Sequence, residues 1–196
     1  MRKTTIIASA VKTLNTVLTD YLVSGPRSIH EFKIDCTKLD ERFLSEDIRH
    51  SLEFKEIFQQ LEKIQDNPCL YVFEIESEIS TKKIIESLKN FGNQTEKVIP
   101  KLKTKIPEHS KTLYVGKVNS LVWGRLITHL GFHTHKNKGN PKASINHGLQ
   151  LHFWAKDLLL QIKYTVIEFE HNMKDVLPVL EKQLAFKLNP IIGKHK

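Results

Sequence analysis

The sequence predicts an α/β (α+β) domain, in which helices flank a small three-stranded, mainly antiparallel sheet, with a helical extension at the N-terminus. Three observations support this prediction. Two short apolar segments and one segment of alternating polarity are typical of strands. Apolar residues at helical spacing fill much of the remaining chain, and 196 residues suffice for one domain with an added lobe. We place the extension at residues 1–65 and the domain at residues 66–196, with an insertion at about 76–110.

The extension is predicted to contain two helices. The first ends at Gly25, and residues 29–34 follow as a short extended piece. Ser45 is expected to cap a second helix that runs to about Gln65, because acidic residues come directly after it. The apolar stripe of the first helix consists of Ile7, Val11, Leu14, Leu18, Tyr21 and Leu22. We expect this part to pack on the sheet; the alternative is an appendage that contacts DNA or forms a dimer.

The first strand of the domain is expected at residues 70–75, which are apolar on both faces apart from Glu74, as in a central strand. The insertion then contributes a helix from Ser80 to about Gly92. A basic stretch follows it and includes Lys101, Lys103 and Lys105. These lysines belong either to a solvated loop or to a patch that follows a phosphate backbone.

A second strand and a short helix occupy residues 112–131. Leu113 to Val115 form an apolar strand, which Gly116 interrupts. Asn119-Ser120 is a candidate helix N-cap, and Gly131 is a candidate stop.

This stretch also carries reactive side chains. Arg125 and His129 are four residues apart and therefore lie on the same face of the predicted helix. The strand before it presents Tyr114 and a bare glycine, Gly116. A phenol, a guanidinium and an imidazole are therefore expected close together.

The C-terminal part predicts a short helix at 148–155, a third strand at 161–170 and a final helix capped by Asp175, with Pro178 in its first turn. The buried stripe of the final helix is expected to be Leu177, Leu180, Leu184 and Leu188. Glu181 is one step off that stripe, where a carboxylate can reach a cleft without full desolvation.

The composition limits the classes of function. A net charge of +8 and a pI near 9.4 are consistent with a polyanionic partner, although a soluble basic protein has the same charge. No apolar run approaches the length of a membrane span, so no membrane association is expected. Cys36 and Cys69 are too few for a disulfide framework, which favours a reduced cytoplasmic setting.

Taken in order, residues 66–196 resemble the GIY-YIG nuclease superfamily. Most members of that family join the two signature strands by a shorter connection than the one here, since Tyr71 and Tyr114 are 43 positions apart. The residues that carry the resemblance are Cys69-Leu70-Tyr71, Tyr114-Val115-Gly116, Arg125, His129, Glu181 and Asn189.

The resemblance implies a metal-dependent endonuclease that hydrolyses phosphodiester bonds in DNA. Glu181 would bind Mg²⁺ or Mn²⁺, and Arg125 would stabilise the charge that develops on the phosphate. Tyr71 or Tyr114 would hold or deprotonate the attacking water, with His129 as a competing base.

Three further positions are candidates for substrate binding. Gly116 would let the backbone approach the substrate closely, and Lys117 and Asn189 would contact it.

The histidines suggest a rival interpretation, in which they bind zinc. Gly131 interrupts the helical spacing between two of them, and the sequence contains no Cys-x-x-Cys, so we do not favour a structural zinc site. The histidines of the zinc hypothesis are His129, His133, His135, His147 and His152. One of His133, His135 or His147 would instead lie near the scissile phosphate, as the resemblance implies.

Two other hypotheses remain. The chain could be a non-cleaving nucleic-acid-binding module on the same fold, because Cys69-Leu70 replaces the expected Gly-Ile and the insertion is long. It could also be a protein-interaction domain with an incidental basic surface. A homodimer would suit cleavage of both strands of a palindrome.

Overall fold

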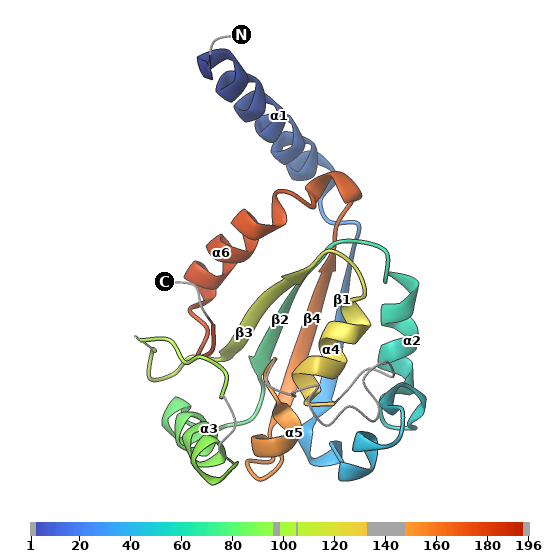
Figure 1. The fold of residues 1–196 in the computed structure, drawn as a ribbon, viewed down its shortest axis with the longest axis vertical. Coiled ribbons are helices and arrows are strands. Elements are labelled where there is room, and N and C mark those ends of the chain that lie inside the picture. The colour runs from blue at the N-terminus through green and yellow to red at the C-terminus, as the bar shows by residue number, and fades with distance from the viewer. Residues whose placement is uncertain (1–2, 96–98, 105, 133–147, 194–196) are drawn as a thin grey trace.

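The computed structural model describes residues 3–95, 99–104, 106–132 and 148–193. An antiparallel four-stranded sheet in the order β1-β4-β2-β3 lies at the centre (Figure 1). The strands are β1 (Ser28–Asp35), β2 (Cys69–Ile75), β3 (Thr112–Val118) and β4 (Gln161–Glu168). The helices are α1 (Lys3–Ser24), α2 (Lys55–Lys63), α3 (Thr81–Thr95), α4 (Val122–Leu130), α5 (Leu151–Trp154) and α6 (Leu177–Leu188).

The prediction of an α+β domain with an antiparallel sheet is confirmed, but the prediction of three strands is wrong. The fourth strand is β1, which pairs along its whole length with β4, from Ser28 opposite Glu168 to Asp35 opposite Gln161. Residues 1–65 therefore do not form a purely helical extension, because they supply one edge of the sheet. The sequence showed an extended piece here but not its partner, since strand pairing depends on contacts more than 100 residues away.

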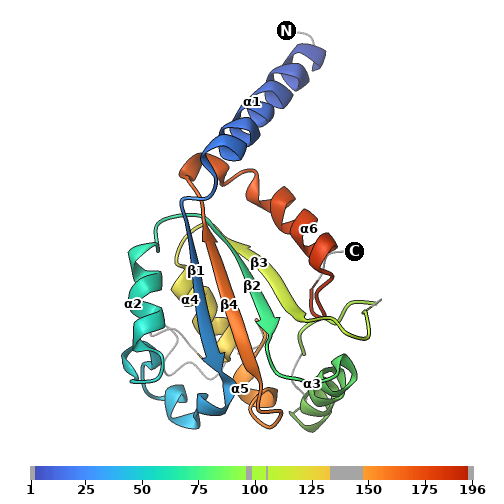
Figure 2. The same cartoon turned by 180° about the vertical axis from the view of Figure 1, so that it is seen from behind.

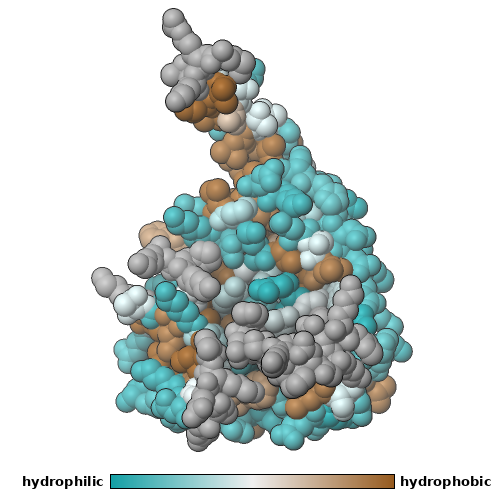
Figure 3. All heavy atoms as spheres, in the orientation of Figure 1, coloured by the Kyte–Doolittle hydropathy of each residue, from teal (hydrophilic) through white to brown (hydrophobic). Residues whose placement is uncertain are grey.

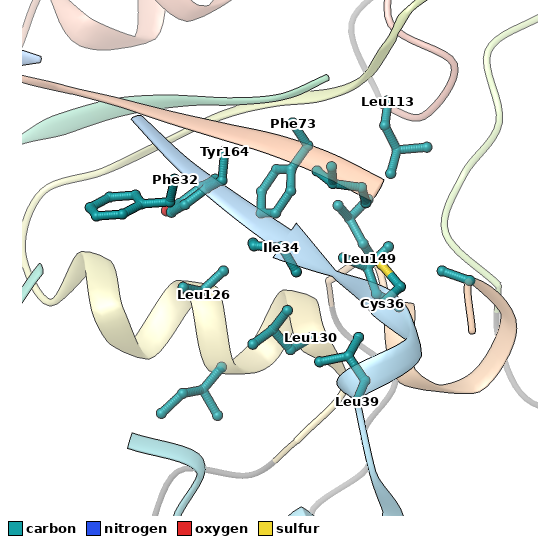
Figure 4. Close-up of a cluster of buried hydrophobic side chains, with 14 of the residues drawn as sticks. Phe32, Ile34, Cys36, Leu39, Phe73, Leu113, Leu126, Leu130, Leu149 and Tyr164 are labelled. Carbon is teal, nitrogen blue, oxygen red and sulfur yellow. The ribbon is translucent and has the colours of Figure 1, made fainter. Parts of the chain in front are cut away.

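One face of the sheet is fully covered. Inward residues of all four strands pack against α2, α4 and α5 (Figure 4). The core includes Phe32, Ile34, Phe73, Tyr164, Leu126 and Leu130. This is the face on which β2 and β3 present Tyr71 and Tyr114.

The opposite face is covered over only part of its width. Helix α6 runs along edge strand β3 and packs Ala185 against Val72 and Val115. Seen from behind, β1 and β4 have no helix over them (Figure 2). Strand β4 accordingly alternates buried and half-buried residues, whereas β2 is buried on both faces except at Glu74, as expected for a central strand. Glu181, one turn before Ala185 on α6, therefore lies close to edge strand β3.

The predicted start of the second helix is wrong. Ser45 caps no helix, because this region folds into short 3₁₀ turns and α2 begins only at Lys55. Asp47, which was expected in the first turn of that helix, instead caps a short 3₁₀ turn. Its side chain accepts a hydrogen bond from the Arg49 backbone N–H at 3.1 Å. Short-range bonds of this kind compete with helix formation.

The starts of α4 and α6 also differ from expectation. The residue before α4 is Leu121, in a left-handed conformation (φ 57°), rather than the Asn119-Ser120 pair. The residue before α6 is Val176, without a side-chain cap, rather than Asp175. Gly131 does end α4 in a left-handed conformation (φ 101°), as predicted.

Helix α1 projects from one end of the sheet, so the expectation that its apolar stripe packs on the sheet is wrong for most of its length (Figure 1). Among the described residues, only its C-terminal part contacts the rest of the structure. Val17, Leu18 and Tyr21 pack there, and the Tyr21 ring lies 5.3 Å from that of Phe169. Among the described residues, no helix combines the length and apolarity that crossing a membrane would require.

Candidate active site

The two signature tyrosines lie on neighbouring strands, although the insertion separates them in sequence. Tyr71 of β2 is opposite Gly116 of β3, and Tyr114 is two residues before that glycine on the same face. The two phenol rings are 6.2 Å apart between centroids. Tyr71 is completely buried, whereas Tyr114 is half-buried. Tyr114 is therefore the phenol that can face a substrate.

Gly116 is explained by the packing of these rings. A β-carbon at this position would lie 2.6 Å from Cζ and Oη of Tyr71 and 2.7 Å from Cε1 of Tyr114. Both distances are far below van der Waals contact, so only glycine lets the two phenols lie over the strand. The sequence predicted that Gly116 makes room for substrate; the structure shows that it makes room for Tyr71 and Tyr114.

Helix α4 places His129 beneath the phenols. Its Nε2 is 3.1 Å from the hydroxyl of Tyr71, and its Nδ1 accepts a hydrogen bond from the Leu149 backbone N–H at 3.2 Å. Because Nδ1 is an acceptor, the proton of the neutral ring is on Nε2, which donates to Tyr71. Burial, followed by the nearby Arg125 charge, lowers the pKa of His129 well below 6.5. His129 is only 1% exposed and has no nitrogen left for water, so this geometry does not suit the predicted role of a competing base.

Arg125 lies one helical turn before His129 and interacts with the same phenols. Burial by itself lowers the pKa of Arg125, but Tyr71 and Tyr114 offset this and raise it overall. Arg125 in turn lowers the pKa of Tyr71, through its charge and a hydrogen bond, although burial keeps that pKa raised overall. The guanidinium is half-buried, so it stays charged beside the phenols and keeps a partly open side.

Glu181 approaches from the other layer of the molecule. Burial is the main reason why the pKa values of Tyr71 and Tyr114 are raised, and the charge of Glu181 raises both further. Glu181 is half-buried on α6, one turn before Ala185, which anchors the helix to β3. The structure thus brings Glu181 into the electrostatic neighbourhood of Tyr71, Tyr114 and Arg125.

The hydrogen bonds point toward Tyr114. His129 donates to the oxygen of Tyr71, and Tyr71 makes a hydrogen bond to Tyr114 that lowers the pKa of Tyr114. The backbone N–H of Leu149 begins this chain by fixing the His129 tautomer. A chain of this polarity stabilises negative charge on the Tyr114 oxygen.

Lys117 and Asn189 were also predicted to contact the substrate. Lys117 is opposite Leu70 of β2 in the sheet, and its side chain leaves β3 on the face opposite Gly116 and Tyr114. Asn189 ends α6 in a left-handed conformation (φ 47°), where its backbone N–H bonds to Ala185. At 1.5 Å per residue, Asn189 is about 12 Å beyond Glu181 along the helix. Its place in the structure is that of a helix cap.

A third tyrosine, Tyr164, lies beside the site but was not among the predicted site residues. Tyr164 of β4 lies 6.0 Å from Tyr71 and 4.6 Å from Phe73 between ring centroids. Its hydroxyl is buried and has no hydrogen-bond partner among the described residues. The alternation of Ile162, Tyr164 and Val166 predicted its inward direction but not its neighbours. Tyr164 provides a natural control for Tyr71.

The donors for a metal are few. Among the described residues, no three His, Cys, Asp or Glu side chains form a cluster that could hold an ion. His152 Nδ1 is 3.0 Å from the carbonyl oxygen of Leu39, and residues 133, 135 and 147 lie outside the described residues. The single half-buried carboxylate of Glu181 fits a hard cation such as Mg²⁺, which keeps most of its waters and needs one or two carboxylates.

Part of the basic insertion is fixed to the domain. Lys103 Nζ donates to the carbonyl oxygen of Ala185 at 3.4 Å, and burial lowers the pKa of Lys103. Leu102 forms an isolated bridge with Ile192. Lys105 lies outside the described residues. Lys103 therefore lies beside the last turn of α6 rather than in a loop surrounded by solvent.

The buried His129 predicts a pH-dependent stability. Its pKa is near 6.5 when unfolded and lower when folded, so below pH 6.5 the unfolded chain binds more protons. The free energy of unfolding should be fully retained above pH 6.5 and fall below it, by up to about 1.4 kcal/mol per pH unit. Burial also lowers the pKa of His152, which adds to this slope.

Urea denaturation at pH 7, 6 and 5 measures this slope. His129→Phe should reduce this slope, because it removes the buried imidazole. An unchanged slope in His129→Phe would show that His129 already titrates normally in the fold.

Comparisons with protein-family models, with curated proteins and with solved structures found no match to this chain.

Proposed function

We propose that this chain is a metal-dependent endonuclease of the GIY-YIG type, which hydrolyses phosphodiester bonds in DNA. One observation carries the proposal most: the charge of Glu181 acts on Tyr71 and Tyr114, which also interact with Arg125. These side chains come from α6, β2, β3 and α4. A basic chain with a net charge of +8 supports a polyanionic substrate.

The side chains divide the work of hydrolysis. Arg125 makes fork-shaped hydrogen bonds to the phosphate and stabilises the charge that develops on it. Tyr114, the more exposed phenol, orients the attacking water and, once deprotonated to the phenolate, accepts its proton. Tyr71 and His129 are positioning residues, because they act through the Tyr114 oxygen.

Glu181 would hold the divalent cation, Mg²⁺ or Mn²⁺, which supplies charge neutralisation at the phosphate and at the leaving oxygen. Without a cation, the Glu181 carboxylate raises the pKa of Tyr114 and opposes its deprotonation. A positive charge beside Glu181 acts in the opposite direction. The same carboxylate thus links cation binding to the basicity of Tyr114.

A plasmid assay tests the proposal. Supercoiled plasmid incubated with the protein and Mg²⁺ or Mn²⁺ should become nicked or linear, and a chelator should prevent this. A gel shift without cutting would instead support the binding module, and the absence of both cutting and shift would contradict a role on DNA.

One observation favours that second function. Burial raises the pKa values of both Tyr71 and Tyr114 above 10, so both phenols are protonated at neutral pH. A pair of neutral phenols beside Arg125 can bind a phosphate without cutting it. Cleavage that increases with pH would favour the nuclease over this alternative.

Removing the Tyr71 hydroxyl should separate positioning from packing. Tyr71→Phe keeps the ring but ends the hydrogen bonds to His129 and Tyr114, so cleavage should fall by about 10-fold to 100-fold. The pH profile of cleavage should shift upward as well, because Tyr114 loses a hydrogen bond that lowers its pKa.

The matched control is Tyr164→Phe. It removes a buried hydroxyl without a hydrogen-bond partner among the described residues, so activity and pH profile should stay as in the wild type. Initial rates on a labelled DNA duplex over a pH series provide the comparison. Equal effects of the two substitutions would mean that only core packing matters at these positions.

A further inference from the structure

Helix α1 has a large exposed apolar surface. The brown spheres along its shaft in Figure 3 belong to a helix that stands away from the sheet. Its exposed apolar side chains are Ile6, Ile7, Val11, Leu14, Leu22 and Val23, with exposed fractions from 40% to 86%. Contiguous apolar surfaces of this kind are rare on monomers and mark interaction sites.

The sequence of α1 is not that of a helix that stands alone. Ten of its 22 residues are β-branched, and such residues lower helix propensity. Helix formation in water then depends on the packing of an apolar face. Only Val17, Leu18 and Tyr21 pack on the rest of the described chain. The apolar side chains in the turns of α1 before Val17 therefore need a partner that covers them.

We propose that this partner is α1 of a second copy, packed in antiparallel orientation along the stripe Ile7, Val11, Leu14, Leu18 and Leu22. These residues follow the 4-3-4-4 spacing of one helix face, and none is charged. A partner helix must therefore also present an uncharged apolar stripe, and α1 itself has one. The stripe continues the surface on which Leu18 already packs in the monomer.

Size and charge agree with this pairing. Two 22-residue helices in contact along their length, about 33 Å, bury on the order of 1,000 Å² in total, which is the lower limit of specific interfaces. A parallel pair would align the two helix dipoles, whereas the antiparallel pair opposes them favourably. It also brings Ile7 level with Leu22 of the other copy.

The segment that follows α1 is held to the sheet. The Arg27 backbone N–H donates to the carbonyl oxygen of Glu168 at 2.9 Å, and Arg27 Nε lies 3.2 Å from the Glu168 carboxylate. Ser28 Oγ donates to the same carboxylate at 2.5 Å. The strand that follows α1 is thus fixed to β4 from its first residue.

Sedimentation velocity of the full chain tests the proposal without reference to any activity. At tens of micromolar the wild type should sediment as a dimer. The double variant Ile7→Glu/Val11→Glu should sediment as a monomer with an unchanged melt of the domain. The matched control Ser9→Glu/Thr16→Glu adds the same charges to the opposite side of α1 and should remain dimeric. A monomeric wild type, or a dimeric Ile7→Glu/Val11→Glu variant, would overturn the proposal.

Cysteine cross-linking tests the orientation. Cys36 and Cys69 are buried and should not react. A mixture of Ile7→Cys and Leu22→Cys chains should form a cross-linked heterodimer with a short bismaleimide, whereas each chain alone should not. Self-cross-linking of either chain alone would mean parallel pairing and would reject the antiparallel arrangement.

Discussion

Glu181→Gln is expected to lower the rate of DNA cleavage by about 10³-fold or more. The substitution keeps the size of the side chain but removes the charge that would hold the cation beside Tyr114 and Arg125. Glu181 is half-buried on α6 and the substitution keeps its size, so the thermal melt should change far less than the cleavage rate. Initial cleavage rates and a thermal melt of the same preparations measure both quantities.

The control for this substitution is Asp175→Asn. Asp175 is an exposed acid shortly before α6. Its substitution removes the same unit of charge as Glu181→Gln but does not change a residue beside the phenols. Cleavage by this control should match the wild type. Arg125→Ala should lose cleavage as Glu181→Gln does, because the phosphate then has no guanidinium partner. Wild-type cleavage by Glu181→Gln would remove Glu181 from the mechanism.

Gly116→Ala is expected to damage both stability and activity. The new β-carbon would lie 2.6 Å from the ring of Tyr71, which is completely buried and has no room to move. Overpacking of this kind costs about 1–3 kcal/mol of unfolding free energy, and more when the neighbour cannot shift. Displacement of either phenol also breaks the hydrogen bonds that run from His129 to Tyr114, so cleavage should fall even in the folded fraction.

Urea denaturation gives the stability of Gly116→Ala, and cleavage rates below the denaturation midpoint give its activity. The control is Lys117→Ala at the next position of β3, which starts from the other face of the strand and adds no atom. Its stability should stay close to that of the wild type. If Gly116→Ala were as stable and as active as the wild type, the close packing of Tyr71 and Tyr114 over this glycine would be wrong.

Features that depend on neighbouring residues were predictable from the sequence. The central position of β2, the stop of α4 at Gly131 and the alternation in β4 all follow from local spacing. The apolar stripe of α1 was expected to pack on the sheet, but most of it is exposed. Tyr71 and Tyr114 are 43 positions apart in the sequence, and their strands pair in the structure. The α3 helix and the basic stretch fit between these strands because loop entropy rises slowly with length.

Features that depend on distant contacts were not predictable. The pairing of β1 with β4 joins segments more than 100 residues apart, so the extended piece at 29–34 did not reveal a fourth strand. The i, i+4 spacing placed His129 beside Arg125 correctly. Its burial depends on the rings of Tyr71, Phe73 and Tyr114, which come from two strands and pack around it. Leu149, which is 20 residues further along the chain, supplies the hydrogen bond to Nδ1. A local pattern gives the direction of a side chain but not what covers it.

The central claim is that Glu181 shares one site with Tyr114, and a titration of the tyrosines tests it most directly. The chain has four tyrosines, so ¹³Cζ labelling gives four signals, and Tyr114→Phe identifies the signal of Tyr114. Burial, followed by the charge of Glu181, is predicted to raise the pKa of Tyr114 above 10 in the wild type. Glu181→Gln should lower that pKa, and Asp175→Asn should leave it unchanged. A Tyr114 pKa that is the same in the wild type and in Glu181→Gln would contradict the shared site.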